Sequence, residues 1–310
     1  MARSSAYDSW EILRVIYLLI VSLIWALSFG LIKNQLAGLD STLVATVRVG
    51  LAALVFIPFL RFRGARSGAL LKLTIVGAIQ FGAMYLLYLH AYVFLKSFEV
   101  ALFTTTTPLY VILFDATLRR KFVYLHWVAA FLAVAGTLIV VWHELTSPEL
   151  LTGLMLVQLS NVCFAVGQLA YRRIRSGMTN APDYTVFAWL YLGAVFISVL
   201  ASLGSSNWST FHPTLAQWGV LAYLGVLSSG ICFFLWNRGA TLVNAGTLAT
   251  LNNLKAPLAI ACSLIVFHEK PASFAEVQRL IFGGVLLIGA VFIAERWGED
   301  RKALVSSEPS

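Results

Sequence analysis

The hydrophobic positions of this 310-residue chain fall into long apolar runs separated by short polar or basic segments. Each run is about 20 residues long, the length that an α-helix needs to cross the hydrocarbon layer of a bilayer. The ten runs cover residues 14–32, 42–60, 70–94, 98–118, 123–142, 150–171, 185–203, 216–236, 242–267 and 276–294. We therefore predict an all-α integral membrane protein with ten transmembrane helices.

The ninth run differs from the others because polar residues interrupt its middle. Lys255 lies in an otherwise apolar stretch, and a lysine at the centre of the bilayer costs about 2.5–3.5 kcal/mol on insertion scales. Such a residue is by default a candidate for a functional site that faces a polar cavity. Asn252 lies on the same helix face three residues earlier. We predict that both side chains bind an anionic group of a solute, whereas the alternative is that Lys255 pairs with a buried carbonyl.

Proline marks the same run and one other. Pro257 has no N–H, so the carbonyl of Asn253 loses its helical partner, and Pro108 does the same to Thr104 in the fourth run. Open backbone at membrane depth is tolerated only beside protein groups or a water-filled cavity. We expect both prolines to loosen their helices for gating.

The chain also repeats itself. Aligning Pro108 with Pro257 pairs the fourth run with the ninth, and Trp25-Ala26 in the first run corresponds to Phe164-Ala165 in the sixth. Each half holds five spans, an odd number, so the second half must be inverted relative to the first. The predicted parts are an N-terminal tail over 1–13, repeats over 14–142 and 150–294, and a C-terminal tail over 295–310.

Composition and charge support a membrane protein that binds no nucleic acid. Hydrophobic residues make up 59% of the chain and charged residues only 12%, against about 25% charged in globular proteins. The net charge of +8 comes mainly from basic residues in the loops on the N-terminal side of the membrane. The positive-inside rule then places both termini in the cytoplasm, and we predict a bacterial inner-membrane location.

Known catalytic and cofactor patterns are missing from the sequence. The three cysteines lie singly inside apolar runs, and there is no Walker loop, HExxH, GxSxG or CxxC pattern. We therefore predict a protein that is not an enzyme and that has no cofactor and no metal site.

Several features together resemble the EamA type of the drug/metabolite transporter superfamily. They are Trp25-Ala26 with Lys33 ending the first run, Arg48 early in the second, Pro108 and Pro257, the exit Phe267-His-Glu269-Lys270, and Gly283-Gly284 and Gly289 in the last run. The resemblance covers about Tyr17 to Ala294 and implies alternating access around a central cavity, in a fold compatible with a monomer. Two positions depart from the pattern: basic residues 119–121 replace a glutamate after the fourth run, and Lys255 replaces an apolar residue.

Other polar or aromatic residues inside the runs are candidates for the cavity wall, each with a structural alternative. Trp25 could be packing, and Thr105 could satisfy backbone carbonyls. Tyr85 and Tyr88 could belong to an interfacial aromatic belt. Gln168 is a buried amide that needs partners. The predicted substrate-binding residues are Lys255, Asn252, Trp25, Tyr85, Tyr88, Thr105 and Gln168.

Two further features have structural interpretations. Arg48 is expected to pair with Asp40 or Glu99, or else to attract anions from outside. Small residues four apart, such as Gly225 and Ser229, are expected to let helices pack closely.

We therefore predict a secondary transporter of a small amphipathic metabolite with an anionic group, such as an amino acid or a related carboxylate. The partners are this small molecule and the lipid bilayer. The alternative is a nutrient or cofactor importer with a biotin-like or S-adenosylmethionine-like substrate. A passive channel or an intramembrane enzyme is the alternative from another class.

Overall fold

A computed structural model of the chain describes residues 2–61, 67–118, 124–141, 147–178, 182–240, 254–271 and 273–305. Within these ranges the secondary structure is helical, with no β-strand. Each predicted apolar run is helical over most of its described length. Seven helical stretches there are long and apolar enough to span a membrane, Trp127–Val140 and Leu254–Val266 are shorter apolar helices, and α13 covers the tenth run.

The elements follow the runs in chain order. They are α1 (Ala2–Gln35), α2 (Ser41–Phe56) with η1 (Ile57–Phe59), α3 (Ser67–Gly77), η2 (Ala78–Ala83), α4 (Met84–Ala91), α5 (Ser97–Phe103), η3 (Thr104–Thr106), α6 (Thr107–Leu118), α7 (Tyr124–Val141), α8 (Pro148–Ser176), α9 (Asp183–Ser205), η5 (Trp208–Thr210), α10 (Leu215–Ala222), η6 (Tyr223–Ile231), α11 (Cys232–Ala240), η7 (Cys262–Val266) and α13 (Phe274–Val305).

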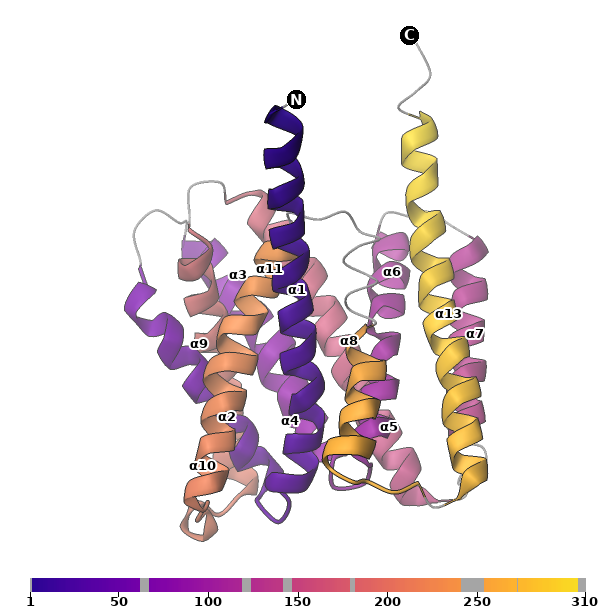
Figure 1. Cartoon of the computed structure of the whole chain (residues 1–310). Coiled ribbons are helices and arrows are strands. Elements are labelled where there is room, and N and C mark those ends of the chain that lie inside the picture. Colours follow the sequence, from indigo (N-terminus) through magenta and orange to yellow (C-terminus); the bar gives the residue numbers. More distant parts are fainter. Residues whose placement is uncertain are drawn as a thin grey trace.

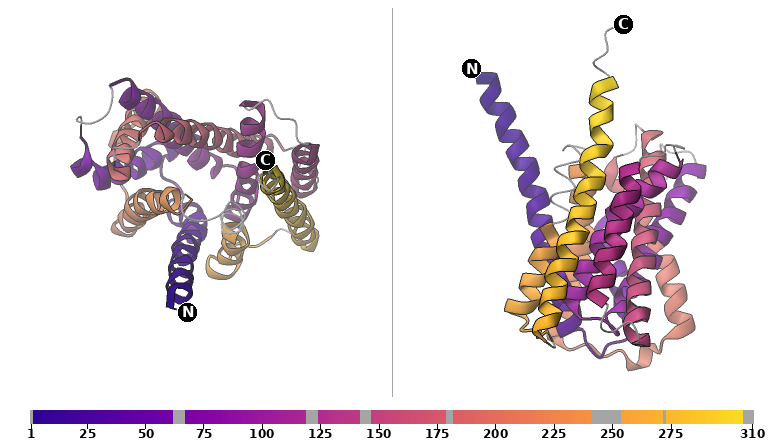
Figure 2. Two further views of the ribbon diagram at one scale, coloured as in Figure 1. Left: turned by 90° about the horizontal axis from the view of Figure 1, so that it is seen from above. Right: turned by 90° about the vertical axis from the view of Figure 1, so that its right-hand side faces the viewer.

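The helices form one bundle in which the start of α1 and the end of α13 project from the same end (Figure 1). We call this end the terminal end and the opposite one the far end. α7 and α13 stand side by side at one edge of the bundle (Figures 1 and 2). Glycines allow this approach, because a Cβ on Gly136 would lie 2.8 Å from the carbonyl oxygen of Gly283.

Five of the described runs contain a change in helix type, and the second run ends in the 3₁₀-helix η1. The third and eighth runs contain the π-helices η2 and η6, the fourth contains the 3₁₀-helix η3, and the ninth ends in the π-helix η7. The third and eighth runs correspond in the two halves, and so do the fourth and ninth. In these two pairs of runs, irregular geometry therefore recurs in equivalent helices of the two halves, whereas the seventh run, equivalent to the second, is the regular helix α9.

The outer surface of the bundle is apolar, as a lipid-facing surface requires. Large hydrophobic side chains such as Phe131, Phe196 and Ile265 are 73%, 68% and 71% exposed. Polar side chains are instead buried inside, among them Arg48, Gln80 and Ser228. Polarity therefore increases inward, the reverse of a water-soluble protein, and the site is to be sought among the buried groups.

Candidate functional site

Two consecutive serines in η6 organise the buried polar groups. A π-helix shifts its backbone hydrogen bonds by one residue, and such segments are frequent at functional sites. Here side chains from other helices bind the carbonyls of this segment: Trp25 Nε1 donates to the carbonyl oxygen of Ser228 at 2.9 Å, and the Tyr191 hydroxyl donates to that of Ser229. Ser28 Oγ also donates to Ser228 Oγ at 3.0 Å. η6 is thereby fixed between α1 and α9.

The same two serines bind the guanidinium of Arg48, which is only 3% exposed. Nε donates to Ser229 Oγ at 2.7 Å, and Nη2 donates to Ser228 Oγ at 3.3 Å. The guanidinium carbon lies 4.3 Å from the ring centroid of Tyr85, whose hydroxyl is 2.7 Å from Ser229 Oγ. Nη1 is buried and has no hydrogen-bond partner in the described part of the protein.

The predicted pairing of Arg48 with an acid is wrong. Asp40 accepts from the backbone N–H groups of Thr42 and Leu43 and so caps α2. Glu99 accepts from the backbone N–H of Lys96 at the start of α5. Both carboxylates serve helix N-termini, where backbone N–H groups need acceptors. Arg48 is therefore held by hydroxyls and a tyrosine ring.

Lys255 reaches the same cluster from the ninth run. Its Nζ lies 5.6 Å from the ring centroid of Trp25, within the range of a cation–π interaction. The side chain is half-buried. The Trp25 ring contacts Lys255, and its Nε1 binds Ser228, which in turn binds Arg48. Asn252, predicted to lie beside Lys255, is outside the described residues.

An aromatic group surrounds Trp25. Its ring lies 4.9 Å from that of Phe233 and 5.1 Å from that of Trp236, measured between centroids. Phe233 is also 5.8 Å from Phe164, the residue that corresponds to Trp25 in the other half, and 6.3 Å from Tyr85. We refer to Trp25, Ser28, Arg48, Tyr85, Ser228, Ser229, Phe233, Trp236 and Lys255 as the central cluster.

The other predicted wall residues take different places. The ring of Tyr88 lies 6.2 Å from that of Tyr85, and its hydroxyl is 2.7 Å from that of Tyr92. Thr105 is fully buried and donates to the carbonyl of Leu102 at 2.6 Å, so its hydroxyl satisfies backbone. Gln168 is half-buried, and its side chain makes no hydrogen bond to another described residue.

The residues next to Thr105 form a second polar group, between the fourth run and α8. Thr106 Oγ1 donates to Gln158 Oε1 at 2.8 Å, and Asn161 Nδ2 donates to the carbonyl of Phe103 at 3.0 Å. Thr107 Oγ1 donates to Asn161 Oδ1 at 3.0 Å. Asn161 thus supplies a donor to the irregular backbone before Pro108, and the two side-chain bonds tie η3 and the start of α6 to α8.

A third set of contacts ties helices together at the far end. Glu269 Oε1 accepts from Asn34 Nδ2 at 2.8 Å and from Ser97 Oγ at 2.6 Å, while Oε2 accepts from the backbone N–H of Ser97 at 3.1 Å. Ser97 Oγ is also 2.5 Å from Ser263 Oγ. We call these four residues the Glu269 lock. It joins the ends of α1, α5 and the ninth run.

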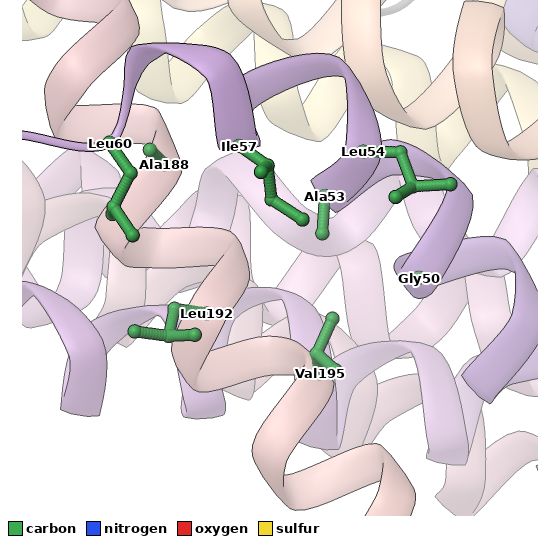
Figure 3. A pocket seen from close by; sticks show the side chains of 8 residues that line it. All are labelled: Gly50, Ala53, Leu54, Ile57, Leu60, Ala188, Leu192 and Val195. Atoms are coloured by element: carbon green, nitrogen blue, oxygen red, sulfur yellow. The ribbon is translucent and has the colours of Figure 1, made fainter.

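A surface groove between α2 and α9 has different chemistry. It encloses about 330 Å³, and Figure 3 shows that only carbon side chains point into it. Leu54, Ile57 and Leu192 in its wall are 60%, 55% and 44% exposed. The lining residues are Gly50, Ala53, Leu54, Ile57, Leu60, Ala188, Leu192 and Val195. The groove lacks a polar group for a charged solute and lies on the lipid-facing surface, apart from the central cluster.

Comparison with known proteins defines the class of this protein. The sequence profile of the EamA-like transporter family matches residues 12–142 and again residues 151–296. The chain therefore belongs to the EamA-like transporter family and is a transporter rather than an enzyme. Because the family matches once in each half, the fold is that of two inverted five-helix repeats, as the sequence predicts.

Two of the curated relatives carry the same substrate in their names. The chain is 38% identical over 293 residues to the biotin transporter of Escherichia coli (strain K12), covering 94% of this chain and 96% of the relative. It is 37% identical to the probable biotin transporter of Pseudomonas aeruginosa, covering 89% and 96%. One crystal structure superposes with a TM-score of 0.64 at 20% identity, covering 93% of this chain and 98% of the other, and shows the same fold.

Proposed function

We propose that this protein imports biotin, or a closely similar amphipathic monocarboxylate, across the bacterial inner membrane. The observation that carries this proposal is the near full-length similarity to proteins named biotin transporter, at 37–38% identity. This similarity favours an importer of a nutrient such as biotin over a transporter of an amino acid. The termini would lie in the cytoplasm, so that the far end faces the periplasm.

The chemistry of the central cluster supports such a substrate. Biotin has an uncharged fused ring, an apolar chain and one carboxylate. Trp25, Phe233 and Trp236 offer an apolar surface that suits the ring and chain. Lys255, at the face of Trp25, is the predicted partner of the carboxylate. The central cluster contains no acidic side chain, the group that the ammonium of an amino acid would need.

Transport would proceed by alternating access between the two repeats. The Glu269 lock joins α1 of the first repeat to the end of the ninth run in the second, and so closes the bundle at the far end. Opening of this lock would admit substrate from the periplasm, and its closure would accompany release to the cytoplasm. The helix breaks before Pro108 and in the ninth run supply places where the backbone can bend.

Uptake of labelled biotin tests the proposal. The gene is expressed in a bacterial strain that can neither make nor import biotin, and growth and initial uptake rates are measured at low external biotin. We expect saturable uptake with the wild-type protein, a loss in Lys255→Ala, and wild-type rates in Lys72→Ala, which removes an exposed lysine on α3.

Uptake no higher than in cells carrying the empty vector would refute biotin import. Resistance to a toxic carboxylate, without uptake, would indicate export instead. A passive channel would give a flux that does not saturate and no counter-exchange in proteoliposomes.

A further inference from the structure

The guanidinium of Arg48 is bound on one edge only. The edge formed by Nε and Nη2 is occupied by the hydroxyls of Ser229 and Ser228. One face lies against the Tyr85 ring. Nη1, with two N–H groups, has no acceptor among the described residues although it is buried. The side chain is thus oriented by three neighbours and left with an unused donor group.

Such an arrangement is costly for a protein that only needs to fold. A buried polar group without a partner is destabilising, and a buried charge without a counter-ion more so. Serine hydroxyls and a tyrosine ring are neutral, so the partners that orient Arg48 do not neutralise it. The remaining donors of a guanidinium match the two oxygens of a carboxylate. The missing partner therefore has the chemistry of an anion.

We propose that Arg48 is a deep binding residue for the carboxylate of the transported substrate, which it contacts through Nη1. This assignment rests on the proposed function and adds a second cation to the one predicted at Lys255. Lys255 is half-buried, whereas Arg48 is 3% exposed. Arg48 therefore contacts the anion only after the surrounding helices have separated, and it determines whether a carboxylate is preferred over a neutral group.

Matched pairs of ligands test this assignment. Purified wild type, Arg48→Gln and Arg48→Lys are titrated with biotin and biotin methyl ester, and with other carboxylates and their methyl esters. Thermal stabilisation reports binding to the folded state. Losing a charge-assisted hydrogen bond weakens binding by about 10- to 100-fold. We expect Arg48→Gln to lose that much preference for the acid over its ester while keeping its affinity for the ester.

The ester is an internal check that each variant is folded. Arg48→Lys keeps the charge but loses the planar donor group, so we expect an intermediate preference. Arg61→Gln removes an exposed arginine that follows η1 and is expected to behave as wild type.

Three outcomes would overturn the assignment. They are an equal loss of acid and ester binding in Arg48→Gln, an unchanged preference for the acid in that variant, and a wild type that binds no carboxylate of the panel. If wild type binds other carboxylates through Arg48 but not biotin, the assignment of Arg48 holds and the proposed substrate is wrong.

Discussion

The Glu269 lock leads to a prediction about the balance between two states of the transporter. The carboxylate accepts three hydrogen bonds, from Asn34 Nδ2, Ser97 Oγ and the backbone N–H of Ser97. Glu269→Gln keeps the shape of the side chain but replaces one acceptor oxygen with an NH₂ group. Because all three partners point N–H or O–H groups at the carboxylate, that NH₂ group faces a donor.

The expected magnitude follows from these contacts. At least one charge-assisted hydrogen bond is lost, worth about 1.5–3 kcal/mol. Such a loss shifts the equilibrium towards the state with the far end open by about 10- to 100-fold. The hydrogen bonds of the lock are present only in the closed state. Their loss therefore destabilises the closed state and leaves the energy of the open state unchanged.

Spin-label distances measure this shift. Labels are placed at Leu215→Cys on α10 and Lys270→Cys, both exposed at the far end, in a protein whose own cysteines have been replaced. We expect Glu269→Gln to enlarge the population with the longer distance. Glu149→Gln is the matched control, because Glu149 at the start of α8 is exposed and accepts a hydrogen bond at 3.0 Å from Ser147 Oγ, two residues away in the chain.

An unchanged distance distribution in Glu269→Gln would refute the assignment of a gating role to the lock. The same conclusion would follow if Glu149→Gln changed the distribution as much as Glu269→Gln.

Two predictions concern stability, measured as thermal unfolding in detergent. Trp25→Phe loses the hydrogen bond to the Ser228 carbonyl and should lower stability by about 1 kcal/mol. Trp25→Ala also removes the ring that packs against Phe233 and should lower stability by about 3–5 kcal/mol. Equal losses of stability in the two variants would contradict this role of the Trp25 ring. Gly193→Ala should destabilise the protein by about 1–3 kcal/mol or more, because the new Cβ would lie 1.8 Å from the Thr74 carbonyl oxygen. Gly204→Ala on the same helix meets nothing within 4 Å and should be neutral or stabilising by about 0.5–1 kcal/mol; destabilisation equal to that of Gly193→Ala would refute the packing argument.

Much of the fold could be predicted from the sequence because bilayer thickness fixes the length of each apolar run. The site could be predicted only in part. Trp25 and Tyr85 are recognisable as large amphipathic groups inside apolar runs, and both pack against Phe233, while Tyr88 packs against Tyr85. Lys255 was recognisable by its charge and contacts Trp25. Each of these residues stands out by its polarity or charge within its own apolar run. It can therefore be identified without knowing which helices lie next to it.

The hydrogen-bond partners of Arg48 could not be predicted from its own run. Periodicity indicates which face of a helix is polar, but it does not indicate which helix lies opposite. The expected acids were closer in sequence, yet η6 supplies the partners from residues 180 or more positions away. From the sequence, Ser229 is predicted only as a small residue that allows close helix packing. Gly225 does pack in that way, with its Cβ position 2.5 Å from Leu51, while Ser229 also binds Arg48.

The two repeats agree in their helix breaks and differ in their charges. Changes in helix type recur in the third and eighth runs and in the fourth and ninth, where both halves would bend as the transporter exchanges states. The cations do not recur: the residue equivalent to Lys255 is Thr106, and the stretch 187–197, which corresponds to the region of Arg48, is uncharged. Each half therefore contributes one cation. Under the proposed function, the cations of both halves would attract the single carboxylate of the substrate. Substrate binding would therefore favour the state in which the two halves close around the substrate, as alternating access requires.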